Sequence, residues 1–207
     1  MRKLIFGLSL SFCLLFISAC QFVEEYNGRE PIGRIISVVN FVQVLRGDRA
    51  LELGAGSWIY EGDAVLSDQG GGADIVMKDK TRLLLSANTQ LDFTRYDVEA
   101  KSARLLLNQG AINIEIKRFG HKKAGGYEIV TRFSTVSAKN SSLWIGYDRG
   151  DDALIAFLLE GESVIVRNRF GAMSLSKEQS GVRTGIGEMP VALDDSGREA
   201  LRLEIRP

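Results

Sequence analysis

Apolar and polar residues alternate along most of the chain from Ile32 onward. In the segment AINIEI, residues 111–116, three isoleucines fall on one face and Asn113 and Glu115 on the other, because successive side chains of a strand point to opposite sides. Similar runs recur about every 10 to 15 residues, separated by Gly, Asn or Asp in turn positions. They cover residues 35–45, 72–79, 81–86, 89–96, 103–110, 127–133, 141–147, 153–161, 162–168 and 172–177. The pattern predicts an all-β fold, a single antiparallel sandwich or a rolled, solenoid-like sheet of many short strands.

The spacing of these runs also indicates how the chain is divided. Only residues 97–107, DVEAKSARLLL, are compatible with a helix, and no strict repeat or long linker interrupts the alternation. We therefore expect one β domain over residues 33–185. Residues 186–207 form a C-terminal extension with an Asp-Asp-Ser-Gly turn, which could add a final short helix or strand.

The start of the chain departs from this pattern. Arg2 and Lys3 precede an apolar run over residues 4–16, which is shorter than the about 20 residues of a membrane-spanning helix. The run ends in the small residues Ser18 and Ala19 followed by Cys20, which resembles the bacterial lipobox. This resemblance implies a lipoprotein signal peptide over residues 1–19, with diacylglycerol attached to Cys20.

The alternative is an ordinary secretory signal, in which Cys20 is a simple thiol. Cys13 would be removed with the signal, so Cys20 would then have no disulfide partner within the chain. An isolated thiol is unusual in an oxidising compartment, whereas an acylated cysteine is not. We expect residues 20–32 to tether the domain to a membrane. Gln21 is not the aspartate of an inner-membrane retention signal, which favours the outer membrane.

Charge and composition limit the classes of molecule that the protein is expected to bind. The chain has 26 basic and 26 acidic residues, and removal of residues 1–19 leaves 24 against 26. Nucleic-acid binding depends on clustered Lys and Arg that neutralise phosphates, so nucleic acid is not expected as a partner. The composition, 45% apolar and 25% charged, is that of a globular protein.

The candidate chemistry favours binding over catalysis. His121 is the only histidine and lies in the basic loop KRFGHKK beside Lys122 and Lys123. A single histidine cannot form a multi-histidine zinc site, and the surrounding lysines indicate a solvated loop rather than a catalytic base. We expect no enzyme activity, cofactor or metal, and we regard these three residues as a possible binding loop.

Two Arg-Gly-Asp tripeptides, residues 46–48 and 149–151, raise an alternative function. On a surface-exposed lipoprotein, loops carrying Arg149 and Asp151 could act as a host-binding adhesin, because exposed loops often carry binding residues. Gly-Asp pairs are also common in turns between strands. The adhesin hypothesis predicts that Asp151→Ala abolishes adhesion to host cells.

Residues 33–93, from GRIISVV to TQLDF, and the later segment LLLNQGAINIEI follow a known spacing of glycines and strands. Gly33, Arg46, Gly62 and Asp63 occupy its glycine, arginine and Gly-Asp positions. The chain therefore resembles the FecR domain family of bacterial envelope proteins. A later segment of the family pattern has hydrophobic and threonine positions. In this chain they are occupied by Tyr127, Ile129, Thr131, Ala138, Leu143 and Ile145.

The chain departs from the family pattern at three places. Lys139, Asn140 and Ser141 replace Arg-Gly-Thr, Arg132 replaces a proline, and residues 79–81 read Asp-Lys-Thr instead of Asp-Gly-Ser. Asn140 can adopt the left-handed conformation that glycine favours, and a serine hydroxyl can replace that of threonine, so we expect the turn to be kept. Lys139 cannot make the bidentate contacts of an arginine.

The resemblance implies a function. Family members are known as regulators whose periplasmic domain senses an outer-membrane receptor, and a cytoplasmic anti-sigma segment and a membrane helix precede that domain. Neither is expected in this chain, which resembles stand-alone, lipid-anchored members. The expected function is non-catalytic binding of another envelope component, protein or glycan, in envelope signalling or assembly.

Overall fold

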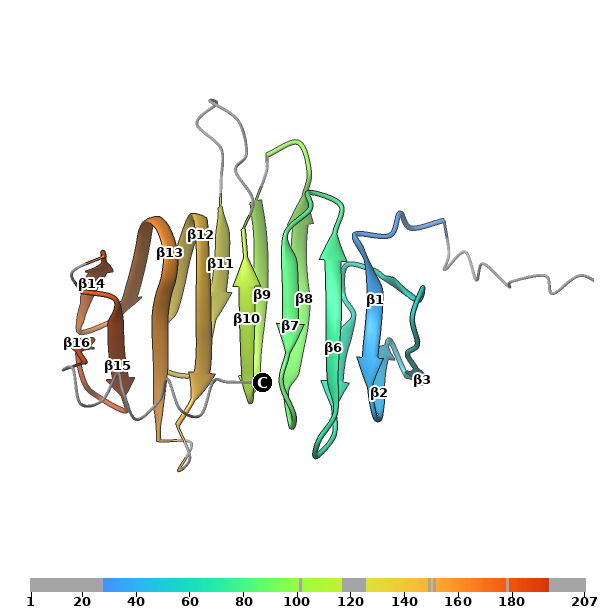
Figure 1. Ribbon diagram of the computed structural model, residues 1–207, viewed down its shortest axis with the longest axis horizontal. Helices are drawn as coiled ribbons and strands as arrows, with labels where there is room; N and C mark the ends of the chain where they lie inside the picture. Colours follow the sequence, from blue (N-terminus) through green and yellow to red (C-terminus); the bar gives the residue numbers. More distant parts are fainter. Residues whose placement is uncertain are drawn as a thin grey trace, which may run out of the picture.

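The computed structural model describes residues 28–100, 102–116, 126–148, 150, 152–177 and 179–193. Within these ranges the regular structure is entirely β-strand, in one continuous sheet that curls so that two halves face each other (Figure 1). The predicted all-β fold is therefore confirmed.

Each half of the sheet has its own strand order. The first half contains, in spatial order, β3 (Arg49–Glu52), β2 (Val42–Arg46), β5 (Ala64–Ser67), β8 (Gln90–Asp97), β9 (Ser102–Gln109) and β11 (Tyr127–Val130). The second half contains β4 (Trp58–Ile59), β1 (Gly33–Val39), β6 (Gly72–Met77), β7 (Arg82–Leu85) and β10 (Ala111–Glu115). Neighbours within each half are antiparallel, except for the parallel pair β9 and β11.

Two long strands, β12 (Thr135–Tyr147) and β13 (Ala153–Asn168), belong to both halves. The first part of β12 pairs with β11 and its last part with β10. The first part of β13 pairs with β15 (Gly181–Gly185) and its last part with β14 (Gly171–Leu175). A short strand β16 (Val191–Ala192) follows β15.

These two strands bend where their backbones take positive φ angles. Asn140 has φ 46° and Gly161 has φ 120°, and a register shift follows between Ser142 and Leu143. A left-handed residue and a bulge turn a strand sharply, which lets the pair pass from one half of the sheet to the other. The expectation that Asn140 takes the left-handed conformation is confirmed.

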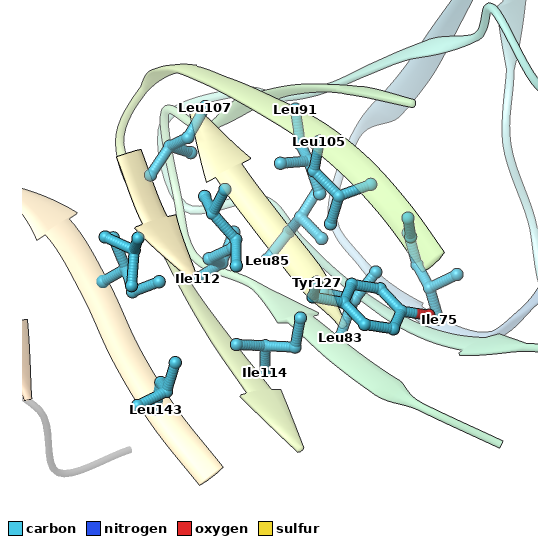
Figure 2. Packing of buried hydrophobic residues seen from close by; sticks show 14 of the residues in the cluster. Ile75, Leu83, Leu85, Leu91, Leu105, Leu107, Ile112, Ile114, Tyr127 and Leu143 are labelled. Atoms are coloured by element: carbon cyan, nitrogen blue, oxygen red, sulfur yellow. The ribbon is translucent and has the colours of Figure 1, made fainter. Parts of the chain in front are cut away.

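The hydrophobic core fills the space between the two halves (Figure 2). It follows from the strand period: Ile112, Ile114 and Ile116 are buried while Glu115 is exposed, as the alternation in AINIEI predicts. In Figure 2 the side chains of the second half meet those of the first. The labelled residues are Ile75, Leu83, Leu85, Ile112 and Ile114 on one side and Leu91, Leu105, Leu107 and Tyr127 opposite, together with Leu143 of β12.

The prediction that residues 97–107 could form a helix is wrong. Strand β8 ends at Asp97, a turn follows, and β9 begins at Ser102. Ala103, Leu105 and Leu107 are buried at every second position, which is the period of a strand and not of a helix. Tertiary pairing with β8 and β11 decides the structure here.

The turn after β6 holds a small polar network. The hydroxyl of Tyr127 donates to Asp79 Oδ2 at 2.8 Å, and the Thr81 amide donates to Asp79 Oδ1 at 2.9 Å. The Asp79 amide donates to the hydroxyl oxygen of Tyr96 at 2.9 Å. Lys80, which stands where the family pattern has glycine, takes φ 69°. The turn keeps its left-handed residue without glycine.

Candidate functional site

A groove of about 800 Å³ lies at the end of the molecule formed by β12, β13 and β15. Its lining comes from the adjoining ends of β12, β13 and β15 and from four connections: the turn before β12, the turn between β12 and β13, the turn between β13 and β14, and the residues after β15. Because β12 and β13 pass between the halves, the groove receives side chains from both. The lining residues are Thr131, Arg132, Phe133, Ser134, Thr135, Gly150, Asp152, Arg167, Asn168, Arg169, Phe170, Gly185, Ile186 and Gly187.

Three arginines dominate the charge of this groove. Arg132, Arg167 and Arg169 are all exposed, and none forms an ion pair with another residue in the described part of the chain. The acidic residue among the described lining is Asp152. A guanidinium group presents five donors in a planar fork and keeps its charge at physiological pH, so the groove is suited to anionic groups.

Two of these arginines are stacked on aromatic rings. The Arg132 guanidinium lies 4.6 Å from the ring centre of Tyr147 and 5.6 Å from that of Phe133. The Arg169 guanidinium lies 4.6 Å from the ring centre of Phe170. Cation–π contacts of this kind restrict the side chains and leave the edges of the guanidinium groups free to donate.

Asn168, the last residue of β13, lies between Arg167 and Arg169 and fixes the turn that carries Arg169. Its Oδ1 accepts hydrogen bonds from the amides of Phe170 and Gly171 at 2.9 Å and 3.1 Å. Its Nδ2 donates to the carbonyl of Glu188 at 2.6 Å and to Thr184 Oγ1 at 3.1 Å. The turn is thereby tied to the segment after β15, so the two walls of the groove are held together.

The rim of the groove is apolar. Phe170 is 45% exposed and Ile186 is 77% exposed, and Met189 and Val191 continue the exposed apolar surface. At the other rim, the hydroxyl of Ser134 is buried and has no hydrogen-bond partner among the described residues. The groove therefore offers both charge and apolar surface to a ligand.

Strand β14 borders the groove and has one open edge. It pairs with β13 along Gly171 to Leu175, and no other strand in the described ranges pairs with it. The Met189 side chain packs close to Gly171 and links the apolar rim to the start of β14. An open edge presents unpaired backbone donors and acceptors that can receive another strand.

Residues 63–162 match the family model described as FecR protein. This segment is a FecR domain. It begins at Asp63, in the turn before β5, and ends just after the bend at Gly161, so it includes all of β12 and the first part of β13. The resemblance inferred from the sequence is confirmed.

Solved structures share the fold around the FecR domain. Two crystal structures from Parabacteroides distasonis ATCC 8503, at 2.50 Å and 1.65 Å resolution, are each described as a candidate anti-sigma factor. Both have a TM-score of 0.55, with 14% and 13% sequence identity. The matches cover 67% and 68% of this chain but 62% and 64% of those chains, so this chain spans less than two thirds of their length. At such identities the likeness shows the fold alone.

A comparison with curated proteins found no match. In the described ranges, the FecR domain and its flanking strands contain no helix long and apolar enough to cross a membrane.

The residues predicted as sites from the sequence lie outside the described residues. These are Cys20, His121, Lys122, Lys123, Arg149 and Asp151. Two direct neighbours of the last pair, Gly150 and Asp152, line the groove at the end of the FecR domain. The predicted lipid attachment and binding loops stay predictions.

Sequence reasoning missed the groove itself. Arg132 was noted only because it replaces a proline of the family pattern, and Arg167 and Arg169 were not singled out. The available signal was local: the segment RNRF, residues 167–170, alternates basic with polar and aromatic residues where a strand passes into a turn. The fold of the FecR domain was needed to bring Arg132 to the same place.

Proposed function

We propose that the chain is a non-catalytic protein of the bacterial cell envelope, whose FecR domain region binds another envelope component, protein or glycan, in signalling or assembly. The observation that carries the proposal is the groove, in which Arg132, Arg167 and Arg169 have no ion-pair partner among the described residues. The FecR match and the fold shared with candidate anti-sigma factors support a regulatory role in the envelope.

The groove chemistry supports binding. Arginine retains its proton and therefore serves as an anion anchor rather than as an acid or base at neutral pH. Stacking of Arg132 on Tyr147 and the hydrogen bonds of Asn168 fix the groove before a ligand arrives. Fixed anchors lose less conformational entropy on binding, which is the physical advantage of preorganisation.

We further propose that a lipid on Cys20 holds the protein at a membrane, with the outer membrane favoured. The described chain begins beside β1, whereas the groove lies at the end that carries β13 and β15 (Figure 1). An anchor near β1 would leave the groove end free to meet a partner away from the lipid surface. The adhesin hypothesis gains no support from these findings.

The test is crosslinking on intact cells of the source bacterium followed by mass spectrometry. Four forms are compared: wild type, Cys20→Ala, a triple variant Arg132→Gln, Arg167→Gln and Arg169→Gln, and the control Arg49→Gln. Arg49 is an exposed arginine on β3, at the far edge of the first half of the sheet. We expect wild type and the control to capture the same envelope component, and the triple variant to lose it.

The outcomes separate the parts of the proposal. Equal capture by the triple variant would reject the groove as the contact surface. Equal capture by Cys20→Ala would make the anchor unnecessary for recognition. The intact mass of the membrane-extracted protein tests the anchor directly, because diacylglycerol adds mass to wild type and not to Cys20→Ala.

A further inference from the structure

We infer that the groove and the open edge of β14 together bind an acidic, extended segment of a partner polypeptide. The inference rests on the proposed function and names the class of ligand. It depends on three features: the charge of the groove, the free strand edge beside it, and the apolar rim that connects the two.

The positive charge of the groove is only partly balanced by neighbouring carboxylates. Nearby carboxylates of Asp148 and Glu188 are both paired with Arg183, at 3.5 Å and 3.4 Å. Arg183 sets one positive charge against these two carboxylates, so the described residues in and beside the groove carry four positive and three negative charges. The positive charge of Arg132, Arg167 and Arg169 faces the single lining carboxylate of Asp152 in the described part of the groove. Carboxylate groups match the guanidinium fork and can bind it through two parallel hydrogen bonds.

The edge of β14 favours a polypeptide over a glycan. Only a polypeptide can continue the ladder of a sheet through alternating amide donors and carbonyl acceptors. Arg167 lies opposite Ala172 in the β13–β14 register, and Arg169 and Phe170 form the turn that leads into β14. A strand added along β14 would extend past this turn and into the arginine groove.

The apolar rim indicates the pattern of the incoming segment. Side chains of a strand alternate between its two faces, so every second residue of the partner meets the same surface. Phe170 and Ile186 offer apolar contacts, while the arginines can donate hydrogen bonds to acidic groups. A segment that alternates apolar and acidic residues satisfies both, with its backbone paired to β14.

The experiment uses the mature chain, residues 20–207, with Cys20→Ala, and a set of fluorescent peptides of about ten residues, the length of a long strand. The main probe alternates valine and glutamate, and the matched control alternates valine and glutamine. A soluble polygalacturonate fragment serves as the acidic glycan. Binding is measured by fluorescence anisotropy, and circular dichroism of each variant confirms that it is folded.

We expect the glutamate peptide to bind and the glutamine peptide to bind at least about tenfold more weakly. Arg167→Gln and Arg169→Gln should each weaken binding by roughly tenfold, and Arg49→Gln should leave it unchanged. Added salt should weaken binding further, because the contacts are charged and partly exposed. Hydrogen exchange of the amides of Gly171–Leu175 should slow when the peptide is present.

Other outcomes would overturn the inference. Equal binding of both peptides would show that acidic groups are not recognised. Unchanged hydrogen exchange in β14 would show that the peptide does not pair with its open edge. Arginine-dependent binding of polygalacturonate without binding of the peptide would assign the groove to a glycan, and failure of both probes would reject an acidic ligand. In these cases the crosslinking experiment still decides the proposed function, because it names no ligand class in advance.

Discussion

Arg46 and Asp63 form a buried, two-armed ion pair at the start of the first half of the sheet. Arg46 Nε and Nη2 donate to the two carboxylate oxygens of Asp63, each at 2.8 Å, and the residues are 8% and 1% exposed. The Tyr60 amide donates to Asp63 Oδ2 at 2.9 Å, and Arg46 Nη2 also donates to the Trp58 carbonyl at 2.9 Å. The pair ties β2 to the turn before β5, where Gly62 takes φ 89°.

Breaking this pair should strongly destabilise the protein. Asp63→Asn leaves the Arg46 charge buried without its carboxylate, and loss of one partner of a buried pair costs about 3–5 kcal/mol. Arg46→Lys should also destabilise, because an ammonium group cannot make both parallel bonds. Urea unfolding followed by circular dichroism measures both changes in the free energy of unfolding.

The exposed pair Arg104 and Glu128 supplies the control for these variants. Its atoms are 3.5 Å apart and its side chains are 55% and 50% exposed. Arg104→Ala should cost less than about 1 kcal/mol, since exposed ion pairs contribute little. Equal losses for Arg104→Ala and Asp63→Asn would show that burial does not determine the strength of the Arg46–Asp63 pair.

Two tyrosines should resist ionisation while the protein is folded. Burial, followed by the charge of Asp79, raises the pKa of both Tyr127 and Tyr96 well above the ordinary value of about 10. The folded state thus keeps protons that the unfolded state releases. The stability from this linkage is present in full below about pH 10 and is lost as the pH rises toward the raised folded pKa values.

Tyrosinate absorbance during an alkaline titration tests this linkage. Of the five tyrosines of the full chain, we expect Tyr96 and Tyr127 to ionise only as the protein unfolds. In urea, all should titrate near pH 10. Tyr127→Phe should lower stability at pH 7 by about 1 kcal/mol, through loss of its bond to Asp79, and reduce the loss of stability at high pH. Complete ionisation with the fold intact would contradict the expectation.

Gly161→Ala should disrupt the bend of β13. An added Cβ would lie 2.4 Å from the carbonyl oxygen of Asn140, and φ is 120°, a conformation that other residues rarely adopt. Backbone strain of this kind costs about 1–3 kcal/mol. Gly54→Ala is the matched control, because an added Cβ there meets nothing within 4 Å. Thermal unfolding should show a large loss for the first and little change for the second; similar melting temperatures would refute the role of the bend.

Lys80→Gly should stabilise the protein. A non-glycine residue in the left-handed region costs about 1–2 kcal/mol, which exceeds the entropic cost of glycine in the unfolded chain, about 0.5–1 kcal/mol. The expected net gain is up to about 1 kcal/mol. Lys139→Gly, in the extended part of β12, should instead destabilise by a similar amount. A loss of stability at both positions would show that the φ of Lys80 carries no strain.

The strands of this fold could be predicted from the sequence, because the alternation of apolar and polar residues is visible within each short segment. In AINIEI, the period of two places three isoleucines in the core, as the structure bears out. The failure at residues 97–107 has a physical cause, since a short apolar run can satisfy either period until strands β8 and β11 pair with it.

A rolled sheet was among the predicted folds, but the strands that join its two halves and the groove could not be predicted in the same way. The bend of β12 and β13 depends on Asn140 and Gly161, which lie close together on neighbouring strands, and no local pattern contains this contact. Arg132 joins Arg167 and Arg169 only after β12 and β13 have paired over their whole length. Long-range pairing therefore creates the candidate site.

Strands β12 and β13 also determine how the molecule responds to mechanical load. Since each strand runs through both halves of the sheet, neither half can slide over or peel from the other while these strands remain intact. Traction on a partner held in the groove would reach both layers at once, through the same two continuous backbones. The protein should transmit tension as a single stiff body, from the bound segment at one end to the strand β1 at the other.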